Sequence, residues 1–183
     1  GDMLHKRITA LIAASVLLLL AGPAAADYAS KVIELVNKER TARGLHPLSY
    51  DKELTAAAEN HSRDMAEHNY FDHTGRDGRD FNERIAAAGY EYRVSGENIA
   101  AGQRTPAEVV DNWMKSERHR KNILNPDFCD IGVGYAEAPE SKLQYYWTQD
   151  FGRHFGINQC PQPAETPSAA DKQKHSGAVK KTP

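Results

Sequence analysis

The sequence lacks the motifs that usually mark a catalytic or nucleotide-binding protein. It contains no HExxH zinc-protease motif, no G-x-S-x-G nucleophile elbow and no Walker loop. The segment Gly132-Val133-Gly134 does not begin a dinucleotide-binding loop, because Glu137 stands where the third glycine is needed and no helix follows. These absences exclude the commonest hydrolase and nucleotide-binding classes that short motifs identify.

Cysteine is scarce, and this bears on both metal binding and disulfide formation. The chain has two cysteines, Cys129 and Cys160, and neither belongs to a CxxC pair or is placed like a nucleophile. In an oxidising compartment two such residues are expected to form one disulfide. They stand just outside the open end of a predicted hairpin of strands at 131–135 and 143–151, which the bond would close.

No apolar run is long enough to cross a bilayer. The run Ile8–Leu20 has 13 residues, whereas a spanning helix needs about 20. It follows the basic segment His5-Lys6-Arg7 and precedes Ala24-Ala25-Ala26, the pattern of a secretory signal peptide. We therefore predict a signal peptide at 1–26, cleaved before Asp27, in preference to a membrane anchor. The mature chain is expected to be periplasmic or extracellular, with no transmembrane segment.

Basic stripes interleaved with aromatic residues are also missing, so nucleic acid is not an expected partner. The segment 161–183 has four prolines, several lysines and no aromatic residue. Such a segment buries too little apolar surface to offset the entropy lost on ordering, and we predict a disordered tail. One domain, 27–160, remains, and we expect it to be monomeric.

Within that domain, periodicity predicts helices first and strands last. Helices are expected at 27–43, from Asp51, at 81–88 and from Thr105, with Pro106 at a first helical position. A loop is expected at 69–80 and a turn-rich link up to Gly96. The two strands of the hairpin follow. This order indicates an α+β or layered α/β/α domain.

Two of the eight histidines lie in sequence contexts suited to a functional site. His73 stands in the polar loop, and His119 lies near a predicted helix end. His61, by contrast, falls on the apolar face between Leu54 and Met65, where a core histidine is the expected role.

Several ordered motifs identify a family resemblance over about residues 29–152. They are Tyr70-Phe71-Asp72-His73-Thr74, Gly96-Glu97-Asn98-Ile99-Ala100, Trp113-Met114-Lys115-Ser116, His119-Arg120-Lys121-Asn122-Ile123-Leu124, Ile131-Gly132-Val133-Gly134 and Gln149-Asp150-Phe151-Gly152. The chain resembles a bacterial member of the CAP superfamily, which comprises cysteine-rich secretory proteins, antigen 5 allergens and pathogenesis-related proteins and is also called the SCP domain family. The resemblance implies a three-layer α-β-α sandwich with a central antiparallel sheet.

The resemblance also implies a binding groove. In eukaryotic members a cavity carries two histidines and two glutamates; His73, Glu97 and His119 match three of them. Ser116 occupies the position of the second glutamate, and Glu117 lies one residue away, about 100° around a helix. The expected groove therefore consists of His73, Glu97, Ser116, Glu117 and His119.

Imidazoles and carboxylates can perform metal chemistry or can form a structural network. His73 and His119 are suitable ligands for Zn²⁺ or another divalent metal, with Glu97 as a third candidate ligand or a water-activating base. So few ligands would hold a metal weakly and exchangeably. The alternative is a buried polar network that fixes the loops.

Three functional hypotheses follow. The first is a secreted binding module for a lipid, a cell-envelope glycan or a protein, as the resemblance implies. The second is a metal-assisted hydrolase with His73 and His119 as ligands and Glu97 as base, in which Glu97 and His119 are the candidate catalytic residues. The third is a purely structural role for the polar cluster.

Overall fold

The computed structural model describes residues 23–160 as helices, strands and their connections. The predicted signal peptide, apart from its last four positions, and the predicted tail lie outside these residues. Helix α1 begins at Pro23, before the predicted cleavage point. The elements in chain order are α1 (Pro23–Thr41), β1 (Ser49–Tyr50), α2 (Lys52–His68), α3 (Phe81–Ala87), β2 (Tyr92–Ala101), α4 (Pro106–Lys115), α5 (Glu117–Ile123), β3 (Asp130–Glu137) and β4 (Tyr145–His154).

The predicted helix starts at Asp51 and Thr105 are confirmed by their caps, whereas the first helix begins four residues before the predicted position 27. The side chain of Asp51 accepts a hydrogen bond from the Leu54 amide at the start of α2, and Thr105 caps α4 in the same way, with Pro106 in its first turn. Such side chains satisfy amide groups that have no partner inside the helix.

The four strands form one sheet in the order β1-β3-β4-β2. The pairs β3–β4 and β4–β2 are antiparallel, as the resemblance implied. The two-residue strand β1 pairs with β3 in parallel, so the sheet is mixed rather than wholly antiparallel.

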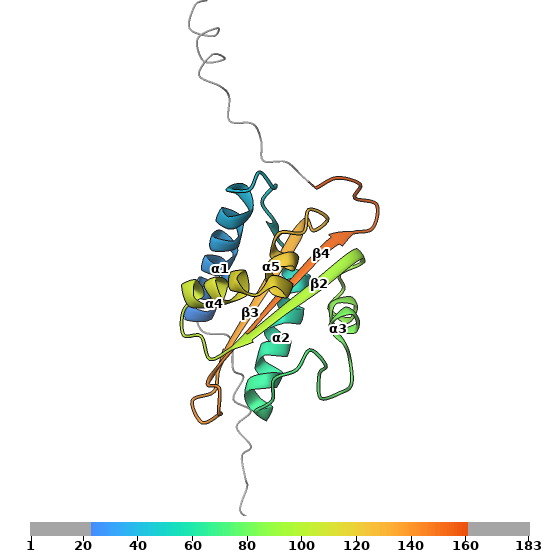
Figure 1. Cartoon of the computed structure of the whole chain (residues 1–183). Coiled ribbons are helices and arrows are strands. Elements are labelled where there is room, and N and C mark those ends of the chain that lie inside the picture. Colours follow the sequence, from blue (N-terminus) through green and yellow to red (C-terminus); the bar gives the residue numbers. More distant parts are fainter. Residues whose placement is uncertain (1–22, 161–183) are drawn as a thin grey trace, which may run out of the picture.

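Helices cover both faces of the sheet, which gives the expected three layers (Figure 1). Apolar residues of α1, α4 and α5 pack with Ile131, Val133, Trp147 and Phe151 into the largest core cluster. On the other face α2 and α3 cover the sheet with two smaller clusters. The alternation along β3 explains this arrangement, since successive strand residues point to opposite faces.

Helix α2 packs directly against the backbone of β3 because that strand presents glycine on the α2 face. A Cβ at Gly132 would lie 2.2 Å from backbone atoms of Leu54 and Thr55, and one at Gly134 would lie 2.2 Å from Ala58. The Gly-x-Gly pattern therefore serves helix-to-sheet packing.

Strand β2 corrects the expectation of a turn-rich link up to Gly96. The segment pairs with β4 along its length, from Tyr92 opposite His154 to Ala101 opposite Tyr146. Its centre contains Gly96, Glu97 and Asn98, residue types that are depleted in strands. The pairing with β4 and the burial of Glu97 and Asn98 override that local preference.

Candidate functional site

Glu97 lies at the centre of the site and is held at both carboxylate oxygens. Its side chain has no exposed surface. Oε1 is 2.6 Å from Nδ1 of His73, and Oε2 accepts from the Arg84 guanidinium, also at 2.6 Å. A carboxylate withdrawn from water requires such partners, because desolvation without them is costly.

Arg84, on α3, was not anticipated from the sequence as a site residue. Its side chain is only 9 % exposed, and beyond Glu97 it donates from Nη1 to the carbonyls of His73 and Arg79, at 2.8 and 3.0 Å. It therefore joins α3, β2 and the 69–80 loop. In the sequence, its position beside the apolar Ile85 in the predicted helix at 81–88 was the one indication that Arg84 could be buried.

The His73 ring faces Glu97 with its Nδ1 edge, and its opposite edge points away from Glu97. The side chain is 46 % exposed, and Nδ1 faces the buried carboxylate. Nδ1–H donates to an ionised carboxylate, so in the neutral ring Nε2 carries the lone pair. The structure therefore brings His73 and Glu97 together and fixes the orientation of the imidazole.

A second acid, Asp150, stands opposite Glu97 on the neighbouring strand β4. It is buried, and its pKa lies well above the usual range, first because burial penalises the charged form and then because Glu97 is close. Burial and the neighbouring Glu97 thus favour the protonated form of Asp150. The sequence placed Asp150 in a family motif but gave no indication of this pairing.

His119 approaches the site from α5 on the other side of β2. Its carbonyl accepts from the Asn98 side chain at 3.1 Å, and its amide approaches Ser116 Oγ at 3.5 Å. The Asn122 side chain donates to the Glu97 carbonyl and to Asn98 Oδ1, which anchors α5 on β2. The pKa of His119 is lowered by burial and then by the nearby His73 and Arg118.

The two remaining groove candidates lie where α4 meets α5. Ser116 is half-buried and ends α4 while it caps α5. Glu117 is the exposed first residue of α5. A cavity of about 660 Å³ lies elsewhere, near the start of β2, where Tyr90, Tyr92 and Phe155 line it.

His61 has the core role expected for it. It is 1 % exposed, and its Nε2–H donates to the Asp72 carbonyl at 2.9 Å. Burial, the largest cause, lowers its pKa.

The donor atoms do not fit a metal ion ligated by Glu97. Both of its oxygens are engaged, and Arg84 places a fixed positive charge beside them. Within residues 23–160, three potential ligand atoms lie within 4.8 Å of one another at His46, Cys129 and Cys160, and not at His73, Glu97 and His119. The metal site at His73 and His119 stays a prediction, without support from Glu97.

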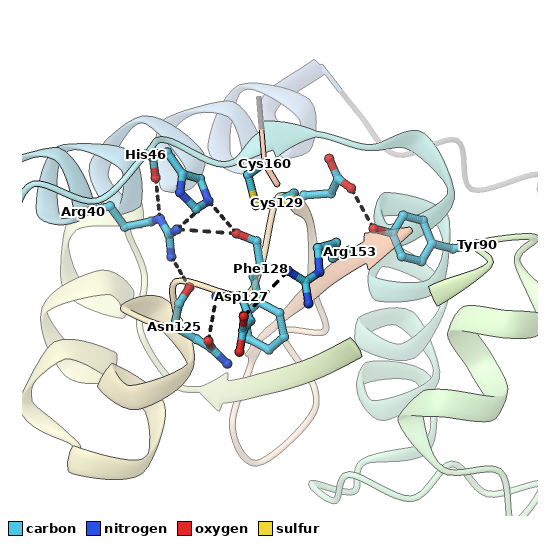
Figure 2. Close-up of a disulfide and its surroundings, with 10 residues drawn as sticks. Arg40, His46, Tyr90, Asn125, Asp127, Phe128, Cys129, Arg153 and Cys160 are labelled. Atoms are coloured by element: carbon cyan, nitrogen blue, oxygen red, sulfur yellow. Dashed lines mark hydrogen bonds and ion pairs between the residues drawn. A yellow bond between two sulfur atoms is a disulfide. The ribbon is translucent and has the colours of Figure 1, made fainter. Parts of the chain in front are cut away.

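The predicted disulfide Cys129–Cys160 is confirmed, so those two sulfurs are bonded to each other (Figure 2). Beside it lies the fully buried Arg40, which donates to the carbonyls of His46, Ile123 and Asn125. Burial lowers the pKa of Arg40 to about 10. This region ties the end of α5 and the 124–129 loop to α1.

The described part of the chain contains no candidate for a membrane-spanning helix. No helix there is both long and apolar enough to span a bilayer.

Comparison with known proteins places the site in a family context. The family model described as "CAP: Cysteine-rich secretory protein family" matches residues 33–151. The Bacillus subtilis protein YkwD is 48 % identical over 124 residues, which cover 68 % of this chain and 46 % of YkwD. This chain thus spans less than half of that curated relative.

Solved structures agree on the fold. An extracellular protein containing an SCP domain from Bacillus anthracis is 31 % identical with a TM-score of 0.63, over 70 % of this chain and 41 % of that one. An outer surface protein from Borrelia burgdorferi has the same TM-score of 0.63 at 21 % identity, over 68 % of this chain and 91 % of that one, and supports the fold alone.

Proposed function

Because the chain belongs to the cysteine-rich secretory protein (CAP) family, we propose that it is an exported binding module whose recognition surface is the polar site around His73, Glu97 and His119. Its ligand is a lipid, a cell-envelope glycan or a protein. Export is supported by the disulfide, by the apolar segment at 8–20 and by the extracellular origin of the B. anthracis neighbour.

The contacts of Glu97 carry this proposal. The carboxylate is bonded to Arg84 and His73, so it orients the His73 ring and the 69–80 loop before any ligand arrives. Preorganisation of this kind favours binding, because less conformational entropy is lost when the complex forms.

The same contacts disfavour the hydrolase hypothesis. A general base needs a carboxylate oxygen within reach of a water molecule, whereas both oxygens of Glu97 are engaged by side chains. Glu97 is better described as the residue that orients His73.

The proposal is tested by sedimentation of the full chain with insoluble peptidoglycan and with phospholipid vesicles. We expect the wild type to be retained by at least one probe and the double variant His73→Asn/His119→Asn to lose retention. His68→Asn is the matched control, because His68 is a partly exposed histidine at the end of α2. Equal retention of all three proteins, or none, would contradict recognition of a lipid or a cell-envelope glycan by this site.

A further inference from the structure

The cavity near the start of β2 lies apart from the polar site and has aromatic residues in its wall. Its volume of about 660 Å³ falls within the usual range of small-molecule pockets. The elements that form it, which are α3, the start of β2 and the end of β4, lie side by side in Figure 1. The lining residues are Ala86, Gly89, Tyr90, Glu91, Tyr92 and Phe155.

Hydrogen bonds hold together the two segments that carry the aromatic residues. The Phe155 amide donates to the Glu91 carbonyl at 3.2 Å, and Nδ1 of His154 donates to the same carbonyl at 3.1 Å. Tyr92 stands opposite His154 in the pairing of β2 with β4. The cavity wall is therefore built from ordered backbone rather than from a separate loop.

The three aromatic side chains of the cavity differ in exposure. Tyr90 is 1 % exposed, and its hydroxyl donates to Asp130 at 2.7 Å, so this ring is a fixed part of the wall. Tyr92 is half-buried, and Phe155 is 69 % exposed. A ligand in the cavity can therefore cover the Phe155 ring without displacing a residue of the core.

The charge of the cavity lining is negative. Glu91 is the one charged residue among the six that line it, and its side chain is exposed. Among the ion pairs of residues 23–160 Glu91 has no partner. The faces of aromatic rings are also negative, so the wall and the carboxylate both favour a cation.

The basic residues nearest in sequence do not line the cavity. Arg93 and His154 each adjoin a lining residue, but neither belongs to the lining. The His154 ring packs on Tyr90, with ring centroids 4.0 Å apart, and its Nε2 lies 3.8 Å from a carboxylate oxygen of Asp51. The lining itself thus presents aromatic faces and a carboxylate without a competing positive charge.

We propose that this cavity binds a quaternary ammonium group of the kind that choline carries. Such a group has no N–H donor, and aromatic faces attract it electrostatically; aromatic residues grouped around it are the usual means of recognising it in proteins. The volume leaves room for the rest of a larger molecule. Free choline and the headgroup of a phosphatidylcholine lipid share this chemistry. The proposal goes beyond the function proposed above, because it concerns a different part of the surface.

The test titrates the full chain with choline chloride and follows the amide NMR signals. We expect shifts at residues 89–92 and 155. The matched probe is the uncharged analogue of choline in which a carbon atom replaces the nitrogen. It has nearly the same shape but no charge, so it should bind at least about fivefold more weakly.

Two pairs of variants test the wall of the cavity. Phe155→Leu should weaken choline binding by about fivefold, whereas Tyr50→Leu should not, because Tyr50 is 63 % exposed on β1 at the other edge of the sheet. Ala86→Leu should block the cavity and abolish binding. Ala87→Leu is its control, since Ala87 is the exposed next residue of α3 and does not line the cavity.

The two sources of the ligand are separated with vesicles. Retention of the wild type by phosphatidylcholine vesicles, with loss in Ala86→Leu and competition by free choline, identifies a lipid headgroup. Choline binding without vesicle retention identifies a free quaternary ammonium compound. Either result supports the proposal.

The absence of any response to choline would overturn the proposal. Equal binding of the uncharged analogue would also overturn it, as would choline binding that Phe155→Leu and Ala86→Leu leave unchanged. The double variant His73→Asn/His119→Asn should keep choline binding, so failure here and failure of the polar site are measured separately. Thermal melting of each variant shows whether a loss of binding comes from misfolding.

Discussion

The Arg84 guanidinium donates to Oε2 of Glu97 across 2.6 Å, and both side chains are almost wholly withdrawn from solvent. This ion pair links α3 to β2, and it determines what the predicted functional carboxylate can do. It engages Oε2 of Glu97, while Oε1 faces His73, so Glu97 acts as a positioning group for His73.

Breaking this pair from one side should destabilise the fold strongly. Glu97→Gln or Arg84→Met leaves a buried charge without its partner, and we expect a loss of about 3–5 kcal/mol in the free energy of unfolding. The double variant should be less destabilised than the sum of the two single variants. Urea unfolding of the two single variants and the double variant measures these free energies.

The exposed pair of Lys31 and Glu34 is the control, because its atoms lie 2.7 Å apart but both side chains are more than half exposed. Lys31→Met should cost less than about 1 kcal/mol. Equal effects at the buried and exposed pairs would show that Glu97 is not held as described.

Asp150 should give the unfolding free energy a characteristic pH dependence. Its pKa in the folded chain is raised above the ordinary value of 3.8, chiefly by burial. The folded state therefore holds the proton more tightly, and its contribution to stability is full below the unfolded pKa and is lost as pH rises through the folded pKa.

Asp150→Asn removes this titration while it keeps a neutral side chain of the same shape. We expect the variant to gain stability relative to the wild type as the pH is raised from about 4 toward neutrality. Unfolding curves at several pH values measure the difference. The control variant Asp111→Asn, at an exposed position of α4, should show no comparable trend. If the wild type instead became more stable relative to Asp150→Asn as the pH rises, the raised pKa of Asp150 would be refuted.

The disulfide should stabilise the folded state because it closes a loop of the chain. Cys129 and Cys160 are separated by 31 positions, and closing a loop of that size stabilises the native state by about 3–4 kcal/mol in the chain-entropy account. Cys129→Ser/Cys160→Ser should lose that amount in urea unfolding. A reducing agent should destabilise the wild type similarly and leave the double variant unchanged; an equal response of both proteins would exclude the disulfide as the cause.

The sequence predicted the layered fold, the main helices and the β3–β4 hairpin because their periodicity and capping residues are local signals. Through the family motifs it named His73 and Glu97 as residues of one groove, and the structure places their side chains 2.6 Å apart. Strand β2 was missed because its central residues disfavour strands locally, and their pairing with β4 is a long-range interaction. Helix α5 was missed for a related reason: its one fully buried apolar residue is Ile123, and Asn122 anchors it on β2 by hydrogen bonds.

Arg84 and Asp150 were missed because neither role can be seen in one segment. Arg84 is a site residue only once α3 lies beside β2, and Asp150 only once β4 pairs with β2. The charge balance of the site, and with it the ligand it favours, depends on these two contacts.

The most direct test of this account is the tautomer of His73, read from the imidazole ¹⁵N shifts at a pH where the ring is neutral. We predict that the proton resides on Nδ1 in the wild type, because the ionised Glu97 accepts it at 2.6 Å. In Glu97→Gln the side-chain amide can itself donate to the ring, so the preference for Nδ1 should be lost. A wild-type ring protonated at Nε2 and unchanged in Glu97→Gln would contradict the account, since Glu97 would then be free to act as a base or a metal ligand.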